Sequence, residues 1–200
     1  MNRRFARMAL AALIGLAIAA VVAWNQLSHL PPGGTITTTA NIGGPYSLVD
    51  HTGKPVTGDT YAGKLQLVYF GYTFCPDVCP TELSTMAQAL DRLGADADKI
   101  QPLFITIDPQ RDTVTQLAAY TPLFHPQMIG LTGSPEQVAA AARAFRVYYA
   151  KAKTDESGHY AMDHSSFVYL MGPDGHFLTV FPHGTDPDKM AAEIRARLAG

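Results

Sequence analysis

Apolar and polar positions follow one another along the chain in blocks that predict a mixed α/β domain. Two short, mostly apolar runs, Leu65–Phe70 and Leu103–Ile107, are typical of strands buried inside a sheet. Between them, residues 81–93 place apolar side chains at helical spacing. Gly94 follows as the expected end of this helix, because glycine readily adopts the left-handed conformation found there.

The second half of the chain continues the alternation of helices and strands. The elements predicted there are helices over residues 114–120, from Ser134 onward and from Asp186 to Leu198, and strands over residues 166–171 and 176–181. Residues 172–175, Gly-Pro-Asp-Gly, indicate a hairpin between the two strands. Strand–helix–strand–helix, then a hairpin and a last helix, is the order of a thioredoxin-like α/β domain.

The N-terminus has a different pattern, typical of a membrane segment. Arg3, Arg4 and Arg7 precede an uncharged apolar run over residues 8–24, which as a helix would be about 25 Å long. This predicts a single-pass transmembrane anchor with the following domain outside the cytoplasm. The alternative is a cleaved signal peptide, since residues 21–23 resemble a small-residue cleavage site.

These patterns divide the chain into three parts. Residues 1–24 are the predicted anchor. Residues 25–44, which contain Pro-Pro-Gly-Gly and a run of threonines, are the predicted linker. Residues 45–200 are the predicted thioredoxin-like domain. The apolar segment lacks the amphipathic, Ser- and Arg-rich character of a mitochondrial presequence. We therefore expect a protein of the bacterial inner membrane, with its soluble domain in the periplasm.

Composition narrows the range of functions. The chain is 47% hydrophobic and 16% charged, and 15 basic against 17 acidic residues give a net charge of −2. With no basic excess to neutralise phosphates, nucleic acid is not an expected partner. The only two cysteines lie four positions apart, which is typical of a redox or metal site rather than a disulfide scaffold.

The two cysteines join the first buried strand to the first helix. Cys75 and Cys79 can place both sulfurs on one side of a helical turn. A helix N-terminus favours anions, so we expect a lowered pKa for the Cys79 thiol. Two thiolates in an accessible loop suit Cu(I) or a reversible disulfide. Two buried structural cysteines are the alternative, which the surrounding prolines and aspartate disfavour.

His164 is the one histidine of seven with a suggestive position. It lies just before a predicted strand, where a loop of a thioredoxin-like fold approaches the helix with the cysteines. If the segment is extended, Tyr160, Met162 and His164 share one face. Met162 would then be either a weak thioether ligand or, as we favour, a residue packed against the core.

Four motifs in order give the chain a family resemblance. Residues 70–80 (FGYTFCPDVCP), 107–113 (IDPQRDT), 130–133 (GLTG) and 163–165 (DHS) are similar to those of the SCO/SenC copper chaperones. The resemblance implies copper, Cu(I) or Cu(II), held by Cys75, Cys79 and His164. It also places the 108–113 loop near the site, although Gln110 replaces an acidic residue expected there. Without the resemblance, the residues of this loop are explained equally well as a polar turn that caps the following helix.

The resemblance further implies a metallochaperone, rather than an enzyme, that delivers copper to the copper A site of cytochrome c oxidase. Its expected partners are the oxidase copper-site subunit, another periplasmic copper chaperone or a thioredoxin-like reductant. One alternative is a thiol–disulfide oxidoreductase that reduces the oxidase cysteines before metallation, using a Cys75–Cys79 disulfide. Another is a thiol peroxidase, because residues 78–82 resemble the peroxiredoxin active site; that reading requires neither Cys75 nor His164.

Overall fold

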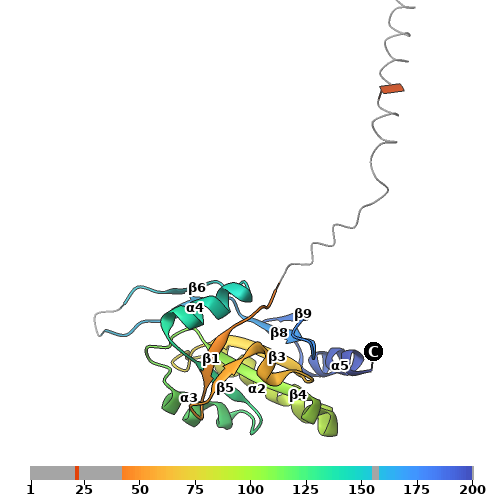
Figure 1. Ribbon diagram of the computed structural model, residues 1–200, viewed down its shortest axis with the longest axis horizontal. Helices are drawn as coiled ribbons and strands as arrows, with labels where there is room; N and C mark the ends of the chain where they lie inside the picture. Colours follow the sequence, from red (N-terminus) through yellow and green to blue (C-terminus); the bar gives the residue numbers. More distant parts are fainter. Residues whose placement is uncertain (1–20, 23–41, 155–157, 200) are drawn as a thin grey trace, which may run out of the picture. The chain divides into compact units, whose positions relative to one another are not determined.

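The computed structural model describes residues 21–22, 42–154 and 158–199 (Figure 1). Most of the predicted anchor and linker lies outside these ranges. Within the described ranges, no helix has both the length and the hydropathy needed to cross a bilayer.

The secondary-structure elements of the domain begin at residue 47. The strands are β1 (Ser47–Asp50), β2 (Pro55–Thr57), β3 (Leu65–Gly71), β4 (Ile100–Thr106), β5 (Ile129–Thr132), β6 (Tyr149–Lys151), β7 (Met162–His164), β8 (Phe167–Met171) and β9 (Phe177–Pro182). The α-helices are α2 (Val78–Leu93), α3 (Val114–Tyr120), α4 (Pro135–Ala144) and α5 (Pro187–Leu198), and short 3-10 helices are η1 (Gly58–Tyr61), η2 (Gly94–Lys99) and η3 (Thr121–Leu123).

A mixed sheet of seven strands, in the order β2-β1-β5-β4-β3-β8-β9, forms the centre of the domain. β3 pairs with β4 in parallel along its whole length, and with β8 antiparallel on its other side. β8 and β9 form the predicted hairpin. A parallel pair connected through a helix, beside an antiparallel hairpin and a last helix, is the thioredoxin-like arrangement, so the predicted fold class of the domain is confirmed.

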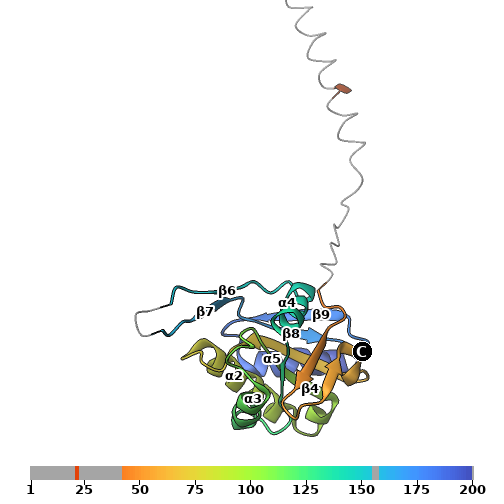
Figure 2. The same cartoon turned by 60° about the vertical axis from the view of Figure 1, so that its left-hand side comes forward.

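Aromatic side chains of β3 anchor both faces of this sheet. Phe70 packs against Phe145, which follows α4, with 5.2 Å between ring centroids. Tyr69 points to the other face and stacks on Phe104 at 6.4 Å. The rings of Tyr69, Phe70 and Phe104 are fully buried. Each contributes about 1.5–3 kcal/mol to the stability of the fold through burial. Figures 1 and 2 show α4 over one face, and α2 with α5 over the other.

Local sequence signals account for several element ends. Ser134 and Gln137 form a capping box at the start of α4, with Ser134 Oγ accepting from Gln137 N and Gln137 Oε1 accepting from Ser134 N. Gly94 ends α2 at a φ of 59°. α2 itself begins at Val78, three residues before the predicted start, so that Cys79 lies in its first turn.

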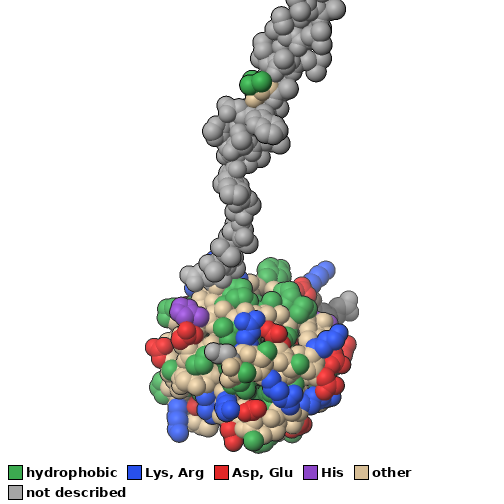
Figure 3. All heavy atoms as spheres, turned by 90° about the vertical axis from the view of Figure 1, so that its right-hand side faces the viewer, with side chains coloured by type: hydrophobic (Ala, Val, Ile, Leu, Met, Phe, Trp, Pro, Cys, Tyr) green, Lys and Arg blue, Asp and Glu red, His purple; other side chains and the backbone are tan. Residues whose placement is uncertain are grey.

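The hydrophobic pattern did not predict every strand. β1, β2 and β5 are three or four residues long, too short for a clear alternation. β6 and β7 pair only with each other, and we call this two-stranded element the ribbon. On the face of the molecule shown in Figure 3, acidic and basic side chains are interspersed.

Candidate metal site

Cys75 and Cys79 lie on the two sides of the start of α2. Cys75 is in the loop of residues 72–77, here called the cysteine loop, and is partly exposed. Cys79 is fully buried in the first turn of the helix, and its backbone N–H donates to Cys75 Sγ at 3.4 Å. A Cβ atom on Gly71, the last residue of β3, would lie 2.9 Å from Cys79 Sγ. Only glycine therefore lets the strand pass this close to the sulfur.

His164 approaches the cysteines from the ribbon. It is the last residue of β7, opposite Tyr149 of β6. Its Nε2 lies 3.4 Å from Cys79 Sγ, and its Nδ1 lies 3.0 Å from the carbonyl oxygen of Ser165. Because a carbonyl only accepts, Nδ1 is the nitrogen that donates, and Nε2 is left facing the sulfur. This is the orientation in which a histidine presents a lone pair to a metal.

The chemistry of these donors fits a single ion. Thiolate and imidazole ligands lie about 2.3 Å and about 2.0 Å from Zn²⁺, a metal that uses the same donors. At a tetrahedral angle, two such ligands would be ~3.5 Å apart, close to the 3.4 Å between Cys79 Sγ and His164 Nε2. Together with the Cys75 sulfur they form the soft S,S,N set that suits copper.

The three donor atoms do not converge on a single metal position in this structure. In the described part of the chain, no three His, Cys, Asp or Glu side chains are placed so that they hold an ion as they stand. The two cysteine side chains instead hydrogen-bond to each other. Binding of an ion by all three donors therefore requires loss of the proton on Cys79 and a change in the placement of the donors.

The two thiols differ in their affinity for a proton. The pKa of Cys75 is lowered to about 3, first because the Cys79 side chain donates a hydrogen bond to it, and further by the backbone N–H groups of Cys79 and Asp77. The pKa of Cys79 is raised, because its hydrogen bond to Cys75 retains the proton and because burial disfavours the thiolate. The predicted lowering at Cys79 is thus wrong: the thiolate is on Cys75, since the contact between the sulfurs and burial outweigh the helix terminus.

Aromatic rings hold the imidazole from two sides. The rings of Tyr69 and Tyr72 each meet His164 edge-on at 6.1 Å between centroids. Met162 and His164 are partly buried and Asp163 between them is exposed, which confirms the predicted extended alternation. Met162 packs against the hydrophobic core, as favoured from the sequence.

The loop of residues 108–113 lies beside the cysteine loop. Asp112 is fully buried and accepts three hydrogen bonds: from Thr73 N at 3.0 Å, from Thr73 Oγ1 at 2.6 Å and from Thr106 Oγ1 at 2.7 Å. Thr73 is two residues from Cys75, so Asp112 joins the end of β4 to the cysteine loop. The sequence marked this loop only through its motif and did not identify Asp112 as an anchor.

Glu82 is a second buried acid that the sequence reasoning missed. It lies three residues after Cys79 and is fully buried. Its Oε1 accepts from His183 Nδ1 at 2.6 Å and from Gly184 N at 3.0 Å. The pair ties the first turns of α2 to the segment after β9. The only signal in the sequence was a carboxylate beside the apolar positions of the predicted helix.

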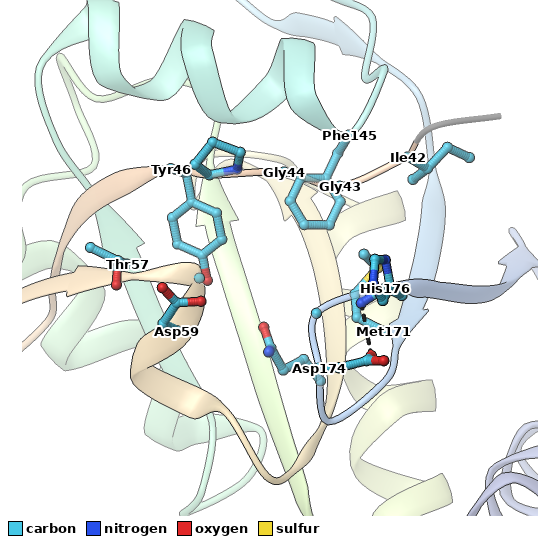
Figure 4. Close-up of a pocket in the computed structure, with 14 residues that line it drawn as sticks. Ile42, Gly43, Gly44, Tyr46, Thr57, Asp59, Phe145, Met171, Asp174 and His176 are labelled. Atoms are coloured by element: carbon cyan, nitrogen blue, oxygen red, sulfur yellow. Dashed lines mark hydrogen bonds between the residues drawn. The ribbon is translucent and has the colours of Figure 1, made fainter. Parts of the chain in front are cut away.

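A separate cavity of about 550 Å³ lies at the other end of β3. Figure 4 shows Tyr46, Phe145, Met171 and His176 around it. Gln66, near the start of β3, also lines it, whereas the cysteines follow the end of that strand. None of the three predicted ligands borders this cavity, so it is not the candidate metal site.

Comparisons with known proteins agree on one family. The profile described as SCO1/SenC matches residues 34–199. The mitochondrial SCO1 homolog of Homo sapiens is 45% identical over 159 residues, which are 78% of this chain and 53% of that protein. The chain thus spans about half the length of this curated relative.

Solved structures with copper bound resemble the domain. ScoI of Arabidopsis thaliana with copper bound has a TM-score of 0.75 and 42% identity, covering 79% of this chain and 98% of that one. ScoI of Bradyrhizobium japonicum with copper bound has a TM-score of 0.73 and 42% identity, covering 78% and 99%.

Proposed function

Because the chain belongs to the SCO1/SenC family, we propose that it binds one copper ion through Cys75, Cys79 and His164. We further propose that it delivers this ion to the copper A site of cytochrome c oxidase. The protein is then a metallochaperone, with binding and transfer in place of catalytic turnover. Relatives solved with copper bound support the choice of metal.

The observation that supports this function most directly is the contact between Cys79 Sγ and His164 Nε2 at 3.4 Å. A disulfide enzyme needs its two sulfurs near each other, but it has no need of an imidazole nitrogen facing the buried one. A metal site needs all three donors on one point. The ribbon has no place in the main sheet, and it brings His164 to the sulfurs.

Burial and exposure of the donors suit transfer as well as binding. Cys79 is fully buried, whereas His164 and Cys75 are both partly exposed, His164 at the end of β7 and Cys75 in a loop. An acceptor thiolate can reach copper from the Cys75 side and replace the protein ligands one at a time. Cys75, as the group already deprotonated at neutral pH, needs to lose no proton to act as a ligand.

The setting of this transfer is also part of the proposal. Residues 1–24 act as a single-pass anchor, residues 25–44 as a linker, and residues 45–200 as the copper domain in the bacterial periplasm. The oxidase copper-site subunit is the acceptor. Another copper chaperone or a thioredoxin-like reductant supplies copper or electrons to the cysteines.

A strain whose only copy is His164→Ala tests the function in cells. With copper kept scarce, the strain should accumulate the folded domain but lose cytochrome c oxidase activity, and added copper should restore part of it. A Met162→Leu strain is the matched control in the same strand and should behave as wild type. Normal oxidase activity in the His164→Ala strain under copper limitation would contradict the proposal.

One observation favours a second candidate, a thiol–disulfide oxidoreductase acting on the oxidase cysteines. The Cys75 thiol has a pKa lowered to about 3 by the hydrogen bond from Cys79, which is the property of an attacking thiolate. Such an enzyme would retain its exchange activity in His164→Ala, whereas copper delivery would be lost. The two functions therefore separate in that one variant.

A further inference from the structure

We infer that Arg111 is the positioning residue that holds the ribbon, and with it His164, against the two cysteines. The inference rests on the proposed copper site and assigns a role to the loop of residues 108–113 beside it. Arg111 does not touch the sulfurs or the imidazole in any contact of the described structure. It acts through the residues packed around its guanidinium.

The guanidinium joins three separate segments. Its Nε forms an ion pair with Asp108 at 2.5 Å within its own loop. Its Nη1 donates to the backbone oxygen of Tyr160 at 3.0 Å, at the entrance to β7. Its Cζ lies over the ring of Tyr160 at 3.6 Å and over the ring of Phe74, in the cysteine loop, at 4.7 Å.

Tyr72 continues this contact to the metal ligand. Its ring lies 5.7 Å from the Arg111 guanidinium on one side, and meets the His164 ring edge-on at 6.1 Å on another. Arg111 therefore packs against Tyr72, and Tyr72 packs against His164, so the position of the guanidinium constrains that of the imidazole.

The ribbon needs such an anchor. β6 and β7 are three residues each and pair only with each other. An isolated pair of strands is at best marginally stable in water. The Tyr160 hydroxyl also donates to Asp108 Oδ1 at 3.1 Å, so Asp108 and Arg111 hold Tyr160 by its hydroxyl, its ring and its backbone. His164 follows four residues later.

The chemistry of this position requires arginine. The side chains of Arg111 and Asp108 are only 19% and 5% exposed, so loss of the cation would leave a buried carboxylate unpaired. A lysine can replace the charge, but it lacks the flat, forked group that stacks on Tyr160 while donating to two oxygens. We therefore expect Arg111→Lys to retain the fold and to loosen the ribbon.

Lys151 offers a matched control. Lys151 is the last residue of β6, and its Nζ lies over the same Tyr160 ring at 3.7 Å, but its side chain is exposed and, within the described residues, forms no hydrogen bond with the cysteine loop. Lys151→Met removes a cation from the Tyr160 ring but leaves the forked guanidinium group of Arg111 in place. It separates the specific role of Arg111 from a general effect of positive charge.

Two measurements on Arg111→Ala, Arg111→Lys, Lys151→Met and wild type test the inference. The first is backbone hydrogen exchange of residues 162–164 in the metal-free, reduced protein. The second is the coupling of a histidine nitrogen to Cu(II) in pulsed electron paramagnetic resonance, with copper affinity. In Arg111→Ala, exchange should become about tenfold faster or more. The nitrogen coupling should weaken, and copper affinity should fall about 10–100-fold, while sulfur-to-copper absorption remains.

Arg111→Lys should fall between Arg111→Ala and wild type, and Lys151→Met should match wild type. Wild-type exchange and wild-type nitrogen coupling in Arg111→Ala would overturn the inference. If Arg111→Ala does not fold, Arg111→Lys decides, and wild-type behaviour of that variant would overturn it equally. An equal loss in Lys151→Met would also overturn it. If wild type itself binds no copper, the proposed function fails, and hydrogen exchange alone then decides the role of Arg111.

Discussion

Cys79 Sγ and His164 Nε2 lie 3.4 Å apart, although 85 residues separate them in the chain. One belongs to the first turn of α2 and the other to the last residue of the ribbon. Gly71 allows the sulfur its place behind the end of β3, and the Ser165 carbonyl turns Nε2 toward it. This contact brings a nitrogen donor to the pair of sulfurs.

Alkylation of the reduced, metal-free protein should identify Cys75 as the reactive thiol. Its pKa is lowered to about 3, so it is a thiolate at neutral pH, and its reaction with iodoacetamide should be nearly constant from pH 5 to 8. The rate should fall only as pH drops toward 3, because the thiolate is then protonated. Cys79, with a raised pKa and full burial, should react slowly. Mass spectrometry of the labelled peptides measures both, and preferential labelling of Cys79 would contradict the assignment.

Oxidation of the metal-free protein should join Cys75 to Cys79. The Cys79 backbone N–H already contacts Cys75 Sγ at 3.4 Å, and residues one helical turn apart can reach the Cα separation of roughly 4.4–6.8 Å that disulfides need. The disulfide removes both sulfur donors, so oxidised protein should not take up copper until a reductant is added. Thiol counting before and after reduction tests this. Two free thiols remaining after treatment of the metal-free protein with oxidant would rule out the disulfide.

Gly71→Ala should damage the site selectively. The new Cβ would lie 2.9 Å from Cys79 Sγ and 3.0 Å from the rings of Tyr69 and Phe104, so the sulfur or the strand end must shift. We expect a loss of about 1–3 kcal/mol in the free energy of unfolding and weaker copper binding. Thermal unfolding and copper titration measure the two effects.

Gly58→Ala is the control for that substitution. The nearest atom to its Cβ is in the Tyr46 ring at 3.6 Å, an ordinary contact. It should therefore leave copper binding unchanged. Equal copper affinity in Gly71→Ala and wild type would show that Gly71 does not shape the site.

Features determined by neighbouring residues were predictable from the sequence. The capping box of Ser134 and Gln137 and the hairpin turn over residues 172–175 depend on a few consecutive residues, and both are present. The apolar runs of β3 and β4 were equally clear, because strands inside a sheet are buried on both faces.

What the sequence did not reveal depends on long-range packing. The ionisation of Cys75 rather than Cys79 follows from their mutual hydrogen bond and from unequal burial, neither of which has a local signal. The contact of Arg111 with Tyr160 joins residues 49 positions apart, and the buried pair of Glu82 and His183 joins residues 101 apart. Motifs indicated which loops meet, and only the structure shows through which atoms.

Copper titration of purified, reduced wild type and His164→Ala tests the central claim most directly. Wild type should bind one copper ion per chain and, as Cu(II), show sulfur-to-copper charge-transfer absorption with coupling to a histidine nitrogen. His164→Ala should bind copper more weakly, about 10-fold or more, and lose the wild-type Cu(II) spectrum, while its thiol–disulfide exchange rate stays near that of wild type. A His164→Ala protein with the affinity and the Cu(II) spectrum of wild type would contradict the account.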